Sequence, residues 1–134
     1  MPCFGLDLDI RRKVDWTAAR KAYAECRHVA PMMLGDYYPL TPHSLDESAW
    51  IAWQFNRPEE GDGVVQAFRR EKNRHMPAVT FLLSGLDPAA QYEVTDFDAE
   101  RSTKTAGKDL MGKGLPVQIK DTPGSAVIVY RRIP

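Results

Sequence analysis

The sequence predicts a mainly β protein, an antiparallel β-sandwich of about eight strands with one N-terminal α-helix. The first observation is a series of short apolar or alternating runs along residues 50–133, each bounded by Gly, Pro or Asp, as is typical of strands joined by turns. The second is that strand and helix patterns do not alternate, which argues against a parallel sheet with crossover helices.

Residues 50–70 predict a β-hairpin and open this series. Two apolar runs, Trp50–Phe55 and Val64–Arg70, flank a polar stretch with one proline and two glycines. Because proline lacks the N–H that a ladder needs and glycine admits positive φ, we expect a longer loop rather than a two-residue turn.

Residues 16–28 predict the N-terminal helix, because apolar side chains recur there at alternating steps of three and four. Asp15 is the expected N-cap, since its carboxylate accepts from the free amides of the first turn, and Pro31 ends the pattern. The stripe is aromatic and small, so we expect it to pack on a flat partner, either the sheet or the wall of a neighbouring domain. The stripe consists of Trp16, Ala19, Tyr23, Cys26 and Ala30.

The rest of the chain predicts short elements between turns. A short extended run is expected at residues 37–40, and residues 44–47 match a capping box that permits one helical turn. Downstream of the hairpin, we expect a buried strand at 79–83, an alternating strand at 92–97 and a polar edge strand at 101–105. A compact glycine-rich loop with two apolar side chains is expected at 107–114, followed by strands at 115–119 and 126–130.

Composition restricts the function classes. The 134 residues suffice for one domain, and equal numbers of acidic and basic side chains give a formal net charge of +0. Without a basic excess, neither a nucleic-acid-binding domain nor attraction to an anionic membrane surface is expected. No apolar stretch approaches the roughly 20 residues that span a bilayer, and the first residues lack a secretory signal pattern, so the sequence predicts a cytoplasmic protein.

No cofactor or metal site is predicted. His28, His43 and His75 are far apart in the sequence and lack the spacing of metal ligands. No serine lies in a nucleophile elbow, and no glycine-rich stretch has phosphate-binding spacing.

Two pairs of aspartates are candidates for hydrolytic chemistry, Asp7 with Asp9 and Asp96 with Asp98. In a strand each pair shares one face, and a glycosidase needs two carboxyl groups beside the scissile bond, one of them kept protonated. Solvated strand ends have the same pattern, and nothing nearby in the sequence shields these groups from water, so we interpret them as surface residues.

Four aromatic residues before and within the hairpin are candidate contact residues: Tyr37, Tyr38, Trp50 and Trp53. Flat aromatic faces bind the C–H faces of sugars, so a carbohydrate surface is one interpretation. The other is that one tryptophan is a core residue and the other packs on the helix or on a partner domain. Trp50 and Trp53 differ by three positions, so in a regular strand they face opposite sides.

Five stretches occur in an order that is typical of one family: GDYYPLTP at 35–42, WIAWQFNRPEEGDGVVQAFRR at 50–70, LSGLDPAAQYEVTD at 83–96, GKDLMGKGLPVQI at 107–119 and GSAVIVYRR at 124–132. Together they resemble the C-terminal part of family 36-type glycoside hydrolases, the α-galactosidase or melibiase group. The resemblance implies an antiparallel β-sandwich at residues 31–134 that follows a catalytic (β/α)8 barrel. Residues 1–30 then correspond to the last segment and final helix of that barrel.

The same resemblance implies an accessory role. The nucleophile and acid/base aspartates of that family belong to the barrel, and no position here matches their motifs, so no catalytic residue is expected and the chain alone is not expected to be an enzyme. The expected function is a non-catalytic C-terminal domain of an α-galactosidase-like hydrolase that packs on the barrel. The alternative is a carbohydrate-binding module that uses exposed aromatics. An isolated chain is expected to self-associate through an exposed apolar patch.

Overall fold

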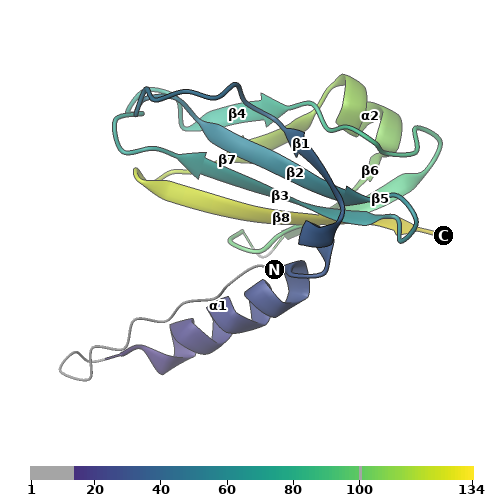
Figure 1. The fold of residues 1–134 in the computed structure, drawn as a ribbon, viewed down its shortest axis with the longest axis horizontal. Helices are drawn as coiled ribbons and strands as arrows, with labels where there is room; N and C mark the ends of the chain where they lie inside the picture. Colours follow the sequence, from purple (N-terminus) through teal and green to yellow (C-terminus); the bar gives the residue numbers. More distant parts are fainter. Residues whose placement is uncertain (1–13, 100) are drawn as a thin grey trace.

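The mainly β architecture predicted from the sequence is confirmed. The structure, a computed structural model, describes residues 14–99 and 101–134. In these ranges eight strands pair antiparallel in two sheets, a six-stranded sheet of order β1-β2-β3-β8-β5-β6 and a two-stranded sheet of β4 and β7 (Figure 1). The strands are β1 (Asp36–Pro39), β2 (Ile51–Arg57), β3 (Asp62–Arg69), β4 (Ala78–Phe81), β5 (Gln91–Asp96), β6 (Arg101–Ala106), β7 (Leu115–Gln118) and β8 (Gly124–Ile133).

Helix α1 (Trp16–Val29) begins where the sequence predicts it. Asp15 Oδ1 accepts hydrogen bonds from the backbone N–H groups of Thr17 and Ala18, both at 3.0 Å, so the predicted N-cap is confirmed. A short 3-10 helix, η1 (Met32–Leu34), follows α1 and leads into β1.

A second α-helix, α2 (Gly107–Gly112), occupies the segment predicted as a compact loop, so the prediction of a loop at 107–114 is wrong. Leu110 is only 1% exposed and anchors the helix in the core. The backbone of Gly107 lies directly against that of Asp87, where any Cβ would clash. Tertiary packing therefore forms a helix in a segment whose glycines disfavour one.

The predicted strands after the hairpin are present with one difference. The polar edge strand predicted at 101–105 is confirmed as β6. The run at 79–83 forms the shorter strand β4, in which Phe81 is buried and Thr80 is exposed, so the prediction of a strand with no exposed face is wrong. The reason is that the two-stranded sheet turns only one face to the core.

The capping box at 44–47 forms no helix. Ser44 Oγ accepts a hydrogen bond from the N–H of Asp46 at 3.1 Å, and Asp46 Oδ1 accepts from the N–H of Ser48 at 2.8 Å. These local bonds form turns, which compete with a helical turn for the same backbone groups.

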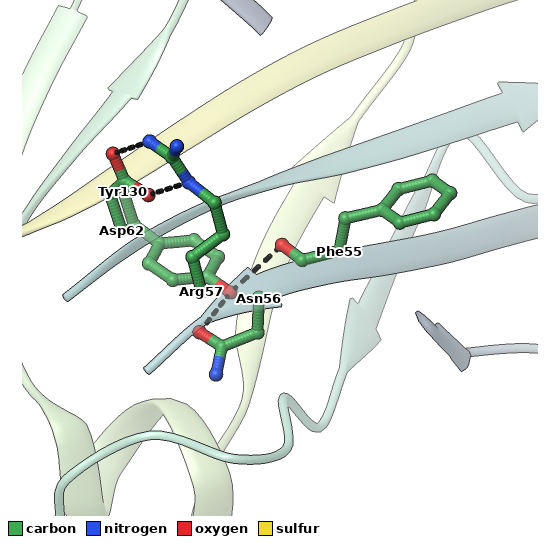
Figure 2. A network of polar contacts seen from close by, with 5 residues as sticks. All are labelled: Phe55, Asn56, Arg57, Asp62 and Tyr130. Atoms are coloured by element: carbon green, nitrogen blue, oxygen red, sulfur yellow. Dashed lines mark hydrogen bonds and ion pairs between the residues drawn. The ribbon is translucent and has the colours of Figure 1, made fainter. Parts of the chain in front are cut away.

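The β2–β3 hairpin has the longer loop that the sequence predicts. Strand β2 ends at Arg57, β3 begins at Asp62, and Gly61 between them has a φ of 68°. Arg57 Nε and Nη2 donate to Asp62 Oδ1 and Oδ2 at 2.8 and 2.7 Å, a bidentate ion pair across the base of the loop (Figure 2). The hydrogen bonds to Asp62 raise the pKa of Arg57.

The sandwich core lies between the two sheets. Side chains alternate along β2: Ala52 and Gln54 are buried on the inner face, which is turned toward β4 and β7, whereas Ile51 and Trp53 are partly buried on the outer face. The core consists of Trp50, Ala52, Val65, Ala67, Phe81, Leu83, Leu86, Tyr92, Val94, Leu110, Leu115, Val117, Ile119, Ala126, Ile128 and Tyr130.

Helix α1 meets the outer face of the six-stranded sheet at its C-terminal end. Val29 packs there with Val64 and Val129, and from this point the helix extends away from the sheet (Figure 1). Trp16 and Tyr23 remain 53% and 50% exposed. The sheet therefore does not cover the aromatic stripe, and the other partner expected for it, a neighbouring domain, stays a prediction.

Candidate functional site

Trp50 belongs to the sandwich core. Its side chain is 7% exposed, its ring lies 6.2 Å from that of Phe81 in an edge-on arrangement, and its Nε1–H donates to the carbonyl of Met76 at 3.1 Å. With the ring enclosed in this way, Trp50 has no open face on which a sugar stacks.

Trp53 and Tyr37 lie on the outer face of the six-stranded sheet. Trp53 Nε1–H donates to Gln66 Oε1 at 2.8 Å, and its ring centroid lies 5.1 Å from that of Phe68 on β3. Tyr37 on β1 is 57% exposed, with its ring 5.4 Å from that of Phe55 on β2. Trp50 and Trp53 thus occupy opposite faces, as their spacing predicts.

Tyr38 faces the other side of β1 and packs against a turn. It pairs with Gln54 in the β1–β2 register, and a Cβ added at Gly85 would lie 2.8 Å from the Tyr38 hydroxyl. Gly85 has a φ of 72°, a conformation that favours glycine. The contact role of the four aromatic residues stays a prediction, and these positions favour Tyr37 and Trp53 as the residues that carry it.

The outer side of strands β1 to β3 carries a group of apolar side chains around Gln66, here called the outer apolar face. The strand registers place its side chains on one side of the sheet, where Phe55 lies opposite both Tyr37 and Val64. Sequence reasoning named only Tyr37 and Trp53 from this surface. Its six members are Tyr37, Pro39, Ile51, Trp53, Phe55 and Phe68.

A buried polar network crosses the inner face of the sheet. Tyr130 is 1% exposed and Gln54 is fully buried, and Gln54 Nε2 donates to the Tyr130 hydroxyl at 2.7 Å. The Tyr130 hydroxyl in turn lies 2.9 Å from Asn56 Oδ1 and 3.3 Å from the carbonyl of Phe55, two acceptors that share its one hydrogen (Figure 2). Burial raises the pKa of Tyr130 above its ordinary value, so the phenol stays neutral.

The network holds the turn that follows β4. Gln54 Nε2 also donates to the carbonyl of Ser84 at 2.8 Å, and Gln54 Oε1 accepts from the N–H of Ser84 at 2.9 Å. Asn56 Nδ2 donates to the carbonyl of Gly85 at 3.0 Å. Among the described residues, every buried side-chain polar atom has a hydrogen-bond partner. All hydrogen-bonding groups of the network are therefore engaged within the protein, as is typical of a network that stabilises the fold.

The aspartate pairs do not form a shielded acid pair in the described part of the chain. Asp7 and Asp9 lie outside the described residues. Asp96 Oδ1 accepts from the N–H groups of Asp98 and Ala99 at 3.0 and 3.3 Å, so this carboxylate shapes the turn after β5. Partial burial, followed by the negative charge of Asp96, raises the pKa of Asp98.

Asp96 and Asp98 line an open groove of about 780 Å³ between the end of β5 and β7. The same groove is lined by the cationic side chains of Arg101 and Lys120. The raised pKa of Asp98 is in the direction that a general acid needs, but Asp96 accepts hydrogen bonds from backbone N–H groups and the groove is open to solvent. The groove therefore lacks the enclosure that keeps a hydrolytic acid protonated beside its substrate.

Residues 14–99 and 101–134 hold no group of three or more His, Cys, Asp or Glu side chains placed to bind a metal ion. Within the same ranges, no helix has the length and apolar character needed to cross a membrane. The cytoplasmic location stays a prediction.

Two antiparallel sheets around one core, with the end of α1 packed on the outer face, define a β-sandwich domain. The sequence model of the "Glycosyl hydrolase family 36 C-terminal domain" matches residues 50–130. The chain therefore belongs to glycosyl hydrolase family 36, and the predicted family resemblance is confirmed.

Two curated relatives are similar over nearly the whole chain. "Probable alpha-galactosidase C" of Aspergillus terreus is 33% identical over 133 residues, which cover 97% of this chain and 17% of the relative. "Alpha-galactosidase C" of Emericella nidulans is 31% identical over 130 residues, which cover 96% of this chain and 16% of the relative. The chain thus spans about one sixth of the length of these relatives.

Solved structures share the fold. The GH36 alpha-galactosidase AgaB from Geobacillus stearothermophilus superposes with a TM-score of 0.74 at 22% identity, covering 93% of this chain and 17% of that one. The alpha-galactosidase from Lactobacillus brevis gives a TM-score of 0.74 at 16% identity, covering 96% of this chain and 18% of that one.

Proposed function

We propose that this chain is the non-catalytic C-terminal accessory region of an α-galactosidase-like glycoside hydrolase and that it packs on the catalytic barrel. Membership of the family 36 C-terminal domain supports the domain type. Both curated relatives bear the name alpha-galactosidase, and this chain covers 17% and 16% of their lengths, so most of each relative lies outside the matched region.

The observation that carries the proposal is the exposure of the α1 stripe. Trp16 and Tyr23 are half exposed, although the end of the same helix is anchored on the sheet through Val29. Aromatic side chains bury large areas when they are covered, so a stripe of this kind is suited to a partner surface. This supports the division in which residues 1–30 are the last segment of the barrel and residues 31–134 are the sandwich.

A chimera tests this function. In the chimera, this chain replaces the matching 133-residue region of the Aspergillus terreus relative. We expect the chimera to hydrolyse a chromogenic α-galactoside. We expect neither this chain alone nor the relative without its matching region to do so, because the former lacks catalytic groups and the latter lacks its supporting surface.

Two results would contradict the proposal. One is turnover by the 134-residue chain alone that the substitution Asp96→Asn abolishes, since the catalytic groups would then lie in the sandwich. The other is a truncated relative that matches the intact enzyme in activity and thermal stability. An inactive or aggregated chimera also counts against the proposal.

The carbohydrate-binding alternative has weaker support. Trp50 is enclosed in the core, and the ring of Trp53 is held against Phe68 and Gln66. Calorimetric titration of the chain with raffinose at millimolar concentration tests this alternative, and we expect no heat of binding.

A further inference from the structure

We propose that the outer apolar face, formed by strands β1 to β3, is a second part of the docking surface for the catalytic region, beside helix α1. The inference rests on the proposed function, and it assigns the interface to the sheet itself. The occupant is the part of the same polypeptide that precedes α1.

The two halves of the outer side of the sheet differ in chemistry. Over β5 and β6 the outward positions are polar: Glu93 lies opposite Arg131 on one side and Lys104 on the other, the pattern of a sheet face in water. Over β1 to β3 most of the corresponding positions are the aromatic and aliphatic residues of the outer apolar face, with Gln66 among them bonded to Trp53. Aromatic side chains are enriched at the buried centre of protein interfaces relative to the rest of the surface, so this composition is typical of an interface.

The charged groups at the edge of the outer apolar face are already paired with each other. Arg57 and Asp62 form a bidentate ion pair at the hairpin end of β2 and β3. Their mutual pairing lets a partner cover the neighbouring aromatic side chains without leaving an isolated charge buried.

The path of the chain indicates the occupant. Segment η1 packs on β2 and β3, so the polypeptide reaches the sheet on its outer side and α1 leaves from there (Figure 1). Seven large hydrophobic side chains are exposed among the described residues, and four of them belong to α1, η1 or β1: Trp16, Tyr23, Leu34 and Tyr37. The exposed apolar surface is thus concentrated where the preceding polypeptide arrives.

The tether favours that occupant over a second copy of the chain. A domain joined through α1 meets the outer apolar face at the effective concentration set by a short connection, in the millimolar range for short linkers, whereas a second copy must bind from solution. The inner face is closed by β4 and β7, so it offers no competing surface of similar character.

Cysteine labelling in the chimera tests the docking surface. Tyr37 on the outer apolar face and Leu82, which follows β4, are both 57% exposed, so they form a matched pair. Leu34 and Leu45 form a second pair, at 78% and 85% exposure. Each residue is replaced by Cys in turn, and the rate of maleimide labelling is measured by peptide mapping in both the chimera and the 134-residue chain.

We expect Tyr37→Cys and Leu34→Cys to react at least tenfold more slowly in the monomeric chimera than in the chain alone. Leu82→Cys and Leu45→Cys should react at the same rate in both proteins. Equal labelling of Tyr37→Cys in an active chimera and in the chain overturns this inference and leaves the proposed function standing. An inactive chimera overturns both.

The same experiment identifies other occupants. If Tyr37→Cys is protected in the chain alone and the chain is dimeric by light scattering, a second copy covers the face and the inference is overturned. If millimolar raffinose protects Tyr37→Cys in the chain alone, the face binds carbohydrate, and the inference is overturned as well.

Discussion

The substitution Gln54→Met tests the buried network that holds the sandwich together. Methionine keeps the length of the side chain but removes three hydrogen bonds, two to the backbone of Ser84 and one to the Tyr130 hydroxyl. An unsatisfied backbone group costs about 1–3 kcal/mol when buried, and Ser84 is only partly buried, so the lower end applies to its N–H and its carbonyl. With the lost bond to Tyr130, we expect unfolding free energy to fall by about 2–3 kcal/mol.

Urea denaturation of the 134-residue chain provides the measurement, with an unchanged m-value as the check for two-state unfolding. In thermal unfolding the same change corresponds to a loss of roughly 6–10 °C in Tm for a chain of this size. Gln118→Met is the matched control, because Gln118 is exposed on β7, and its effect should stay within about 0.5 kcal/mol. If Gln54→Met is as mild as Gln118→Met, the network does not stabilise the fold as described.

Three further predictions concern stability. Gly63→Ala places a Cβ against the Tyr130 side chain and the carbonyl of Phe55. We expect the free energy of unfolding to fall by about 3 kcal/mol, or the protein not to fold. A Tm within a few degrees of that of the parent protein would refute the clash. Asp15→Ala removes the N-cap of α1 and should cost about 1 kcal/mol of helix stability, seen as faster amide exchange in the first turn; unchanged exchange there would contradict the capping role. Asp98→Asn should raise Tm at about pH 7 and leave it unchanged at about pH 3. The pKa of Asp98 is higher in the folded state, so the wild-type protein loses stability as pH rises from the unfolded-state pKa through the folded-state pKa. The neutral amide of asparagine does not ionise, so the variant avoids this loss. A larger gain at pH 3 than at pH 7 would reverse this sign.

Local patterns were sufficient to predict most of the fold. The strand boundaries follow from turn residues such as Gly61, and the start of α1 follows from Asp15, whose carboxylate meets the predicted amides. The spacing of Trp50 and Trp53 also predicted their opposite faces. Each of these features depends on neighbours within a few positions, which sequence reasoning can see.

The features that the sequence did not predict depend on distant neighbours. Helix α2 forms because Leu110 enters the core and Gly107 fits against Asp87, a contact between separate segments. The network joins Gln54 to Tyr130 across 76 positions, and nothing in the local pattern of either residue indicates the pairing.

The outer apolar face had a signal in the sequence that was not used. The run WIAWQF at 50–55 has almost no polar alternation, which is typical of a strand covered on both faces. The sandwich core covers the inner face through Ala52 and Gln54, whereas on the outer face Phe55 packs against the cluster of Val29 and Met32. Ile51 and Trp53 beside it stay only partly buried.

A crystal structure of the chimera is the most direct test of the claim that this chain supplies a supporting surface. We expect Trp16, Tyr37 and Trp53 to become buried under side chains of the catalytic region of the relative, with the galactoside-binding pocket built from that region alone. Solvent on the outer apolar face, together with carboxylates of the sandwich in the galactoside-binding pocket, would contradict the claim.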